Sequence, residues 1–250
     1  MLKELLERIR QGHRTIPYPV QAPALPDRFR GRPTLPLAPC EASCRACETI
    51  CPTGAMTCPQ GKPSLDLGRC LFCADCATAC PTGALSFTVQ HRLSVWGREE
   101  LILGQGTPAT STKPEDARLR LIRRSLKLRQ VSAGGCGACE ADINVLGTPG
   151  FDLGRFGIQI VASPRHADAL VVTGPVTENM RLALEKTYRA MPPPRLVVAV
   201  GACAISGGPY RDHDTTHNGV AGVLPVDLWI PGCPPHPLTI LDGLLKLKGA

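Results

Sequence analysis

Thirteen cysteines dominate the residues of this chain that could do chemistry. The stretch SAGGCGACEAD (132–142) places Cys136 and Cys139 in a C-x-x-C pair between glycines and follows them with two acids, Glu140 and Asp142. Paired thiolates at this spacing are typical metal ligands, and a metal cluster held by cysteines usually takes four of them. The next cysteine along the chain is Cys203. The spacing therefore predicts a site that is completed by residues far away in the sequence.

Nine of the thirteen cysteines fall between residues 40 and 90, where the chain repeats itself. CRACETICPTGAM (44–56) and CADCATACPTGAL (73–85) agree at eight of thirteen positions, which indicates two similar half-units that share a core. The second repeat has the spacing C-x2-C-x2-C-x3-C-P. In bacterial ferredoxins with this spacing, three sulfurs bind one [4Fe–4S] cluster and the fourth binds the neighbouring cluster.

This crossed pattern predicts the ligands of two clusters. One set is Cys40, Cys44, Cys47 and Cys80, and the other is Cys51, Cys70, Cys73 and Cys76. The gap between Cys40 and Cys44 is one residue longer than the gap between Cys70 and Cys73. This difference leaves open that the spare Cys58 replaces Cys40 as a ligand. The other interpretation of Cys58 is a small buried hydrophobic residue. Zinc ribbons also use paired cysteines, but they do not explain the two Cys-Pro endings.

The C-terminal half shows the alternation of strands and helices that is typical of α/β proteins. Four short apolar runs predict strands at 128–131, 169–172, 196–200 and 226–230, and 177–190 predicts a helix with Thr177 as its N-cap. A strand–helix–strand unit of this length predicts a parallel sheet, whose ligands bind beyond the carboxyl ends of the strands. The cysteines that follow these runs are Cys136, Cys139, Cys203 and Cys233. They are predicted to share a third [4Fe–4S] cluster; a zinc site or scattered structural cysteines are the alternatives.

These patterns predict the fold class and the domain organisation. We expect an α+β ferredoxin-like two-cluster domain, followed by an α/β domain with a parallel, flavodoxin-like sheet. The expected boundaries are an N-terminal arm with an amphipathic helix at 1–39, the two-cluster domain at 40–90, a Gly/Pro-rich linker at 91–127 and the α/β domain at 128–250.

Composition and charge narrow the classes of function. The chain starts without the apolar segment of a signal peptide, so its cysteine excess favours metal ligation in a reducing compartment over disulfides. Residues 1–130 carry 19 Lys and Arg against 11 Asp and Glu, but no recognition motif accompanies this basic charge and we expect no nucleic-acid binding.

An apolar stripe at the N-terminus is formed by Leu2, Leu5, Leu6 and Ile9. Such a stripe is typical of a helix that docks on a membrane or partner, or of one that packs on its own domain.

The motifs resemble two families of redox subunits. The cysteine repeats, with TIPYPVQAPALPDRFRGRP (15–33) before them, resemble the two-cluster ferredoxin subunits of respiratory complex I and of membrane-bound [NiFe] hydrogenases. The later motifs resemble the small cluster-bearing subunit shared by complex I and energy-converting group 4 hydrogenases: GGCGACEAD, ASPRHADALVVTGPVTENM (162–180), GACAISGGPY (201–210) and PGCPP (231–235). Complex I subunits carry adjacent cysteines at the first position, whereas hydrogenase-type subunits space them as here. The chain departs from both families because it joins the two subunits in one polypeptide.

The resemblance implies a function. It implies the electron-transfer subunit of a formate-hydrogenlyase-like [NiFe] hydrogenase, with three [4Fe–4S] clusters that relay electrons to or from a nickel–iron site in a partner large subunit. Further implied partners are membrane-arm subunits and an electron donor or acceptor such as a formate- or CO-linked protein. The implied location is cytoplasmic, peripheral on the inner face of the cell membrane. A quinone-reducing or nickel-free relative of complex I and a free ferredoxin-type carrier are the alternatives.

Other polar residues receive smaller roles. Hydrogen chemistry is expected on the partner, so this chain is predicted to hold no catalytic residue. Glu140 and Asp142 either relay protons or favour the N-terminus of a helix. His213 and His217 are expected to be solvated loop residues. Arg165 and His166 belong to a family motif and are expected at an interface or around a cluster.

Overall fold

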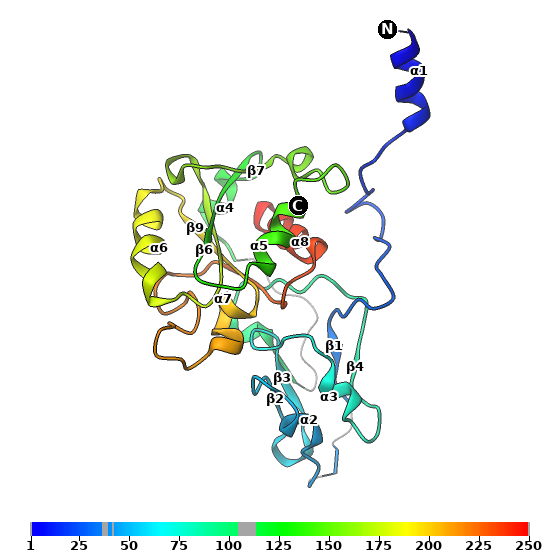
Figure 1. The fold of residues 1–250 in the computed structure, drawn as a ribbon, viewed down its shortest axis with the longest axis vertical. Helices are drawn as coiled ribbons and strands as arrows, with labels where there is room; N and C mark the ends of the chain where they lie inside the picture. The colour runs from blue at the N-terminus through cyan, green and yellow to red at the C-terminus, as the bar shows by residue number, and fades with distance from the viewer. Residues whose placement is uncertain (1, 37–39, 42, 105–113, 250) are drawn as a thin grey trace.

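The computed structural model describes residues 2–36, 40–41, 43–104 and 114–249. Figure 1 shows a sheet covered by helices, a smaller cysteine-rich part below it, and one N-terminal helix that stands away from both. The long N-terminal arm runs past the sheet-bearing part before it enters the cysteine-rich part. The arm therefore connects the isolated helix to the rest of the molecule along one side.

The large sheet has five parallel strands. Their order is β10 (Leu228–Ile230), β9 (Leu196–Val200), β8 (Ala169–Thr173), β6 (Leu126–Ser132) and β7 (Ile158–Ile160). Every residue of β8 and β9 is buried, as the apolar composition of strands covered on both faces requires. The predicted parallel α/β sheet is confirmed, and β7 is an edge strand that the sequence pattern did not predict.

Helices cover both faces of this sheet. They are α4 (Ala117–Leu121), α5 (Ala138–Val145), α6 (Glu178–Ala190), α7 (Ala202–Ser206) and α8 (Pro237–Lys248). One core contains Ile143 of α5, the apolar side of α8 and Val171 of β8, and the other contains Leu184 of α6 and Val172 of β8. Successive residues of β8 thus enter opposite cores. The predicted helix at 177–190 is present, although Thr177 occupies the N-cap position without a side-chain capping hydrogen bond.

The cysteine-rich part contains short elements in two small sheets. Strands β2 (Met56–Thr57), β3 (Ser64–Asp66) and β5 (Ile102–Leu103) form one antiparallel sheet, and β1 (Pro33–Thr34) pairs with β4 (Ser86–Phe87). Helices α2 (Ala46–Thr49) and α3 (Asp75–Thr78) occupy equivalent places in the two repeats. Strand β5 and helix α4 lie in the range predicted as a linker, of which 105–113 fall outside the described residues.

Helix α1 (Leu2–Gln11) buries none of its residues. Its stripe of Leu2, Leu5, Leu6 and Ile9 is between 54% and 74% exposed, so the structure does not show the predicted alternative in which the helix packs on its own domain. The arm behind it is anchored: Ile16 N–H donates to Gly150 O at 2.9 Å and Tyr18 is buried. Of the helices in the described ranges, none is both long and apolar enough to span a bilayer.

Candidate metal centres

The first candidate site lies at the carboxyl edge of the parallel sheet. The loop after β6 carries Cys136 and Cys139, the loop after β9 carries Cys203, and the loop after β10 carries Cys233. Cys136 is exposed, while Cys203 is buried. The pKa of the Cys139 thiol is raised by burial and then by the nearby Cys203, Glu140, Cys233 and Cys136. The structure therefore brings together the four cysteines that the strand pattern predicted to meet.

Glycines let the backbone of these loops approach the sulfurs closely. A Cβ atom at Gly201 would lie 2.6 Å from Cys139 Sγ, and one at Gly208 would lie 2.8 Å from Cys203 Sγ. Gly174, in the loop after β8, packs its backbone against Gly135, where an added Cβ would be 3.0 Å from the Gly174 Cα. The loop of the central strand therefore contributes glycine backbone and no cysteine. The sequence analysis did not predict a role for Gly174 or Gly208.

The donor set fits an iron–sulfur cluster. Burial, and after it the nearby Cys233 and Cys136, raise the pKa of Cys203 to about 12. Burial and Cys136 also raise the pKa of Cys233. Bound metal reverses this effect, because a cation stabilises the thiolate form of its ligands. In a cubane each sulfur binds a different iron. Four sulfur ligands of one zinc ion would lie about 3.8 Å from one another. Among the described residues, no three His, Cys, Asp or Glu side chains stand close enough to share a single ion.

The second group gathers cysteines of both repeats. The thiols that raise the pKa of Cys70, after the dominant effect of burial, are Cys76, Cys51 and Cys73. Cys51 comes from the first repeat, as the crossed pattern predicts. The amide of Phe72 donates to Cys70 Sγ at 3.3 Å, and the amide of Ala55 donates to Cys51 Sγ at 3.2 Å. Amide donors of this kind stabilise thiolate charge and tune the potential of a cluster.

The third group contains one cysteine more than a cluster needs. A cavity of about 100 Å³ is lined by Cys40, Cys44, Cys47, Cys58 and Cys80. Cys80 comes from the second repeat and completes the crossing, and the Thr82 hydroxyl is the main cause of its lowered pKa. The structure thus places the four predicted residues of this set around one cavity, together with the spare Cys58.

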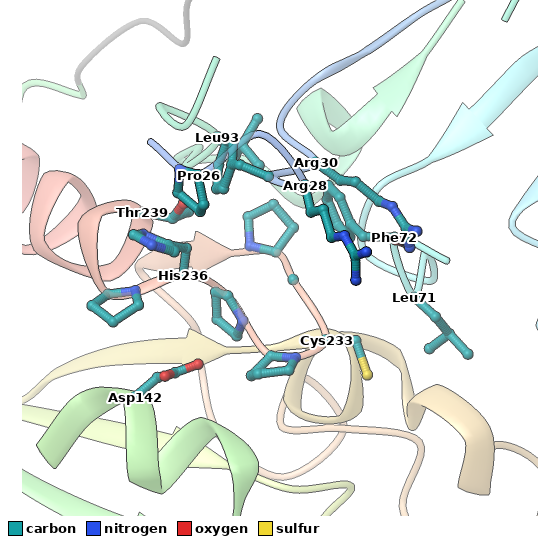
Figure 2. Close-up of a pocket in the computed structure, with 16 residues that line it drawn as sticks. Pro26, Arg28, Arg30, Leu71, Phe72, Leu93, Asp142, Cys233, His236 and Thr239 are labelled. Atoms are coloured by element: carbon teal, nitrogen blue, oxygen red, sulfur yellow. Dashed lines mark hydrogen bonds between the residues drawn. The ribbon is translucent and has the colours of Figure 1, made fainter. Parts of the chain in front are cut away.

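Helix α7 joins the first site to the second group. Ser206 Oγ donates to Gly68 O at 2.8 Å, two residues before Cys70, and a Cβ at Gly68 would lie 2.6 Å from Ile205 Cγ2. Leu71 and Phe72 of the same loop line a cavity of about 370 Å³ together with Cys233 (Figure 2). These contacts bring the Cys70 loop close to the elements that hold Cys203 and Cys233.

Comparison with known proteins identifies the C-terminal half. The family described as NADH ubiquinone oxidoreductase, 20 Kd subunit, matches residues 136–247, and the 4Fe-4S binding domain matches residues 63–86. The probable membrane-bound hydrogenase subunit mbhJ of Pyrococcus furiosus is 40% identical over 126 residues, which cover 50% of this chain and 75% of that protein. The chain belongs to the 20 kDa subunit family.

Two further relatives of the 20 kDa subunit family show how much of each protein is shared. Formate hydrogenlyase subunit 7 of Escherichia coli is 42% identical over 131 residues, 52% of this chain and 51% of that protein. An NADH-quinone oxidoreductase subunit of Heliobacterium modesticaldum is 41% identical over 117 residues, 46% of this chain and 67% of that protein. The chain therefore spans about half the length of the E. coli relative. These matches confirm the predicted class, an iron–sulfur electron-transfer subunit of an oxidoreductase complex.

The two acids after Cys139 differ in their surroundings. Glu140 lies in the first turn of α5, where it accepts a hydrogen bond of 2.6 Å from Thr173 Oγ1. Burial alone would raise the pKa of Glu140, but hydrogen bonds from Ser132 and Thr173 outweigh it and lower the pKa. Burial raises the pKa of Asp142, which lines the cavity of Figure 2. Glu140 therefore ties α5 to β8, and a proton-relay role for either acid stays a prediction.

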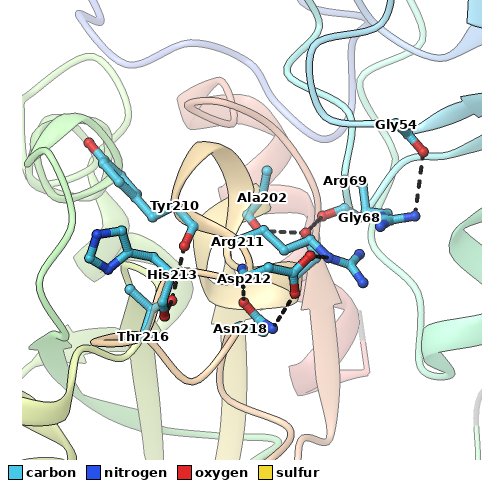
Figure 3. Close-up of polar contacts among 11 residues, drawn as sticks. Gly54, Gly68, Arg69, Ala202, Tyr210, Arg211, Asp212, His213, Thr216 and Asn218 are labelled. Atoms are coloured by element: carbon cyan, nitrogen blue, oxygen red, sulfur yellow. Dashed lines mark hydrogen bonds and ion pairs between the residues drawn. The ribbon is translucent and has the colours of Figure 1, made fainter.

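The remaining polar candidates lie apart from the cysteine groups. His217 Nε2 pairs with Glu178 Oε2 at 2.6 Å, and His213 Nδ1 lies 3.0 Å from Thr215 Oγ1. Hydrogen bonds between Asp212 and Asn218 hold the loop of His213 (Figure 3). The two histidines therefore contact different residues and share no partner. Arg165 and His166 end a short helix (Pro164–His166) before β8. They lie before β8, at the edge of the sheet opposite the loops of Cys136 and Cys203, and their expected role at an interface or around a cluster stays a prediction.

Proposed function

We propose that this chain is the electron-transfer subunit of a membrane-associated [NiFe] hydrogenase of the formate-hydrogenlyase type. In this proposal a two-cluster ferredoxin domain and a 20 kDa-type domain form one polypeptide with three [4Fe–4S] clusters. The observation that carries the proposal is the gathering of the twelve predicted ligands into three groups within one molecule. The spaced pair Cys136 and Cys139, together with the similarity to formate hydrogenlyase subunit 7, favours the hydrogenase branch.

The protein contributes position and electrostatics to this relay. When bound, each cluster supplies one-electron redox chemistry. Ser206 and Ile205 hold the Cys70 loop against the helix that carries Cys203. Arg30 donates to the carbonyl oxygens of Phe72 and Cys73 at 3.0 and 2.7 Å and fixes the same loop from the arm. We therefore place the Cys70 group next to the sheet-edge site, and the Cys40 group farther away.

The exposed end of the relay faces a partner. Cys136 is exposed at the sheet edge, where we place the large subunit with its nickel–iron site, so that hydrogen chemistry occurs on that partner. At the other end, the Cys40 group exchanges electrons with a donor or acceptor such as a formate- or CO-linked protein. Joining the two parts in one chain replaces a dissociable contact with an intramolecular one of high effective concentration.

The N-terminal helix supports a peripheral membrane location. Its exposed stripe of Leu2, Leu5, Leu6 and Ile9 lies on a helix that also carries basic residues, a combination typical of docking at a membrane surface. We propose that α1 holds the complex on the inner face of the cell membrane, beside the membrane-arm subunits. Leu5→Gln with Leu6→Gln is then expected to release the complex from membranes, whereas the control Glu4→Gln leaves it bound.

Purification of the intact complex tests the proposal. We expect about twelve irons for each copy of this chain, nickel in a partner subunit, and hydrogen turnover. About eight irons would remove one of the three clusters. The similarity to the NADH-quinone oxidoreductase subunit of H. modesticaldum favours a second candidate, a quinone-reducing or nickel-free complex. A complex that lacks nickel but reduces quinone would select it, and a freely isolated monomer without partners would contradict both.

A further inference from the structure

Five thiols, rather than four, surround the cavity of the first cysteine repeat. Four of them are the residues assigned to a cluster, and the fifth is Cys58, which is only 1% exposed. Cys58 lines it with the four cysteines, and its position therefore raises the question of which sulfurs bind iron.

The backbone fixes Cys58 against two members of the set. The amide of Cys58 donates to Glu48 Oε2 at 3.2 Å, and Glu48 follows Cys47 in α2. The amide of Cys40 donates to Gly61 O at 2.8 Å, three residues after Cys58. Gly61 has a φ of +72°, and a Cβ atom there would collide with the Cys40 carbonyl. The segment 58–61 is therefore tied both to the helix of Cys47 and to Cys40.

Electrostatic proximity gives the same arrangement. Of the neighbouring thiols that raise the pKa of Cys40, after burial, Cys58 has a larger effect than Cys44 or Cys80. Cys58 is also the thiol with the largest effect on the pKa of Cys47, ahead of Cys44. Because Coulomb effects weaken with distance, Cys58 belongs to the same group of neighbouring thiols as Cys40 and Cys47.

The second repeat provides an internal comparison. The residue 29 positions after Cys58 is Phe87, whose ring packs against Phe72 with centroids 6.2 Å apart. That repeat has no fifth thiol, and it has the ordinary two-residue gap between Cys70 and Cys73. The spare thiol and the longer gap after Cys40 therefore occur together in the same half.

We propose that Cys40 and Cys58 are alternative ligands of one iron in the cluster that also uses Cys44, Cys47 and Cys80. In the exchange, the bond from iron to Cys40 sulfur breaks and a bond to Cys58 sulfur forms, while the proton of the Cys58 thiol passes to Cys40. The step moves no electrons and needs no oxidant. It rests on the proposed function, because it requires a cluster at this site.

The test compares single and double variants in the purified complex. Iron and acid-labile sulfide are measured for each copy of the chain, and the spin state of the reduced and oxidised clusters is followed by electron paramagnetic resonance. Cys40→Ser and Cys58→Ala are each expected to keep the wild-type content of about twelve irons. The double variant is expected to lose one iron, with a three-iron signal, or the whole cluster of four. Cys47→Ser is the positive control for loss.

Each contrary result has a definite meaning. Loss of iron in Cys40→Ser equal to that of the double variant overturns the exchange, because Cys58 then fails to replace Cys40. Loss in Cys58→Ala alone also overturns it, provided that Cys58→Val, which retains more volume in the core, shows the same loss. A wild-type protein with only eight irons and no cluster signal from this site refutes the proposed three-cluster function instead, so the two failures are distinguishable.

Discussion

Replacement of Gly201 by alanine tests whether close backbone approach holds the sheet-edge site. Gly201 has a φ of +89°, and a Cβ atom there would lie 2.6 Å from Cys139 Sγ. With its ψ of 157°, Gly201 lies in a backbone region that is essentially confined to glycine, where an alanine costs about 1–3 kcal/mol. The added methyl group in a packed site costs about 1–3 kcal/mol more, because a sulfur that binds a cluster cannot move aside. The expected total is roughly 2–6 kcal/mol.

Gly83→Ala is the matched control. Gly83 also has a positive φ, +63°, but a Cβ atom there meets nothing within 4 Å, so this variant carries only the backbone strain. At about 2–4 °C for each kcal/mol in a chain of this size, the clash is expected to lower the apparent melting midpoint of Gly201→Ala by roughly 2–12 °C more than that of the control.

Iron analysis accompanies the melting experiment. Gly201→Ala is expected to lose up to about four irons, those of the sheet-edge site, while Gly83→Ala retains them. Equal midpoints and full iron in both variants would refute the reasoning, since the Gly201 backbone would then have room for a side chain.

Three other contacts give predictions of similar sharpness. Ser206→Ala leaves the Gly68 carbonyl without its donor, and a cost of about 1–3 kcal/mol is expected in urea unfolding of the cysteine-rich part. Tyr18→Phe removes the 2.8 Å hydrogen bond to Asp242, and limited proteolysis is expected to cut the arm faster. Arg118→Met removes the partner of Asp116 and Asp227 at 2.7 and 2.5 Å. Because the hydrogen bond from Arg118 is the main cause of the lowered pKa of Asp116, the advantage of the wild type in urea midpoint should be full at pH 7 and shrink below about pH 4; an advantage independent of pH would contradict this.

The parts of the site that could be predicted are those governed by topology. Cysteines that follow strands of a parallel sheet must meet at its carboxyl edge, and Cys203 and Cys233 do so with Cys136 and Cys139. Thr177 could be placed at the start of α6 from residue type alone. The sequence could not predict that Thr177 lacks a capping hydrogen bond. A Cβ at Gly134 would lie 2.4–3.0 Å from the Thr177 side chain, so this side chain packs against the cysteine loop instead.

The elements that escaped prediction depend on distant partners. Strand β5 has two residues, and its place is set by the pairing of Leu103 with Leu65 rather than by its own sequence. Edge strand β7 follows Gly157 and leaves Gln159 and Ile160 exposed, so it lacks the buried run that revealed β8. Helix α8 is buried over most of its surface, which removes the polar face that usually reveals a helix. The place of Cys58 depends on folding of both repeats.

One apolar core runs without interruption from the cysteine repeats to the large sheet. It contains Cys47 and Cys76 as well as Leu184 and Val197, so neither part closes off its own interior. Without the sheet, the cysteine-rich part would expose its side of this core to water, and Ile205 would lose its contact with Gly68. We therefore expect that one part cannot be exchanged for the corresponding part of another protein unless the core side chains between the two parts change as well.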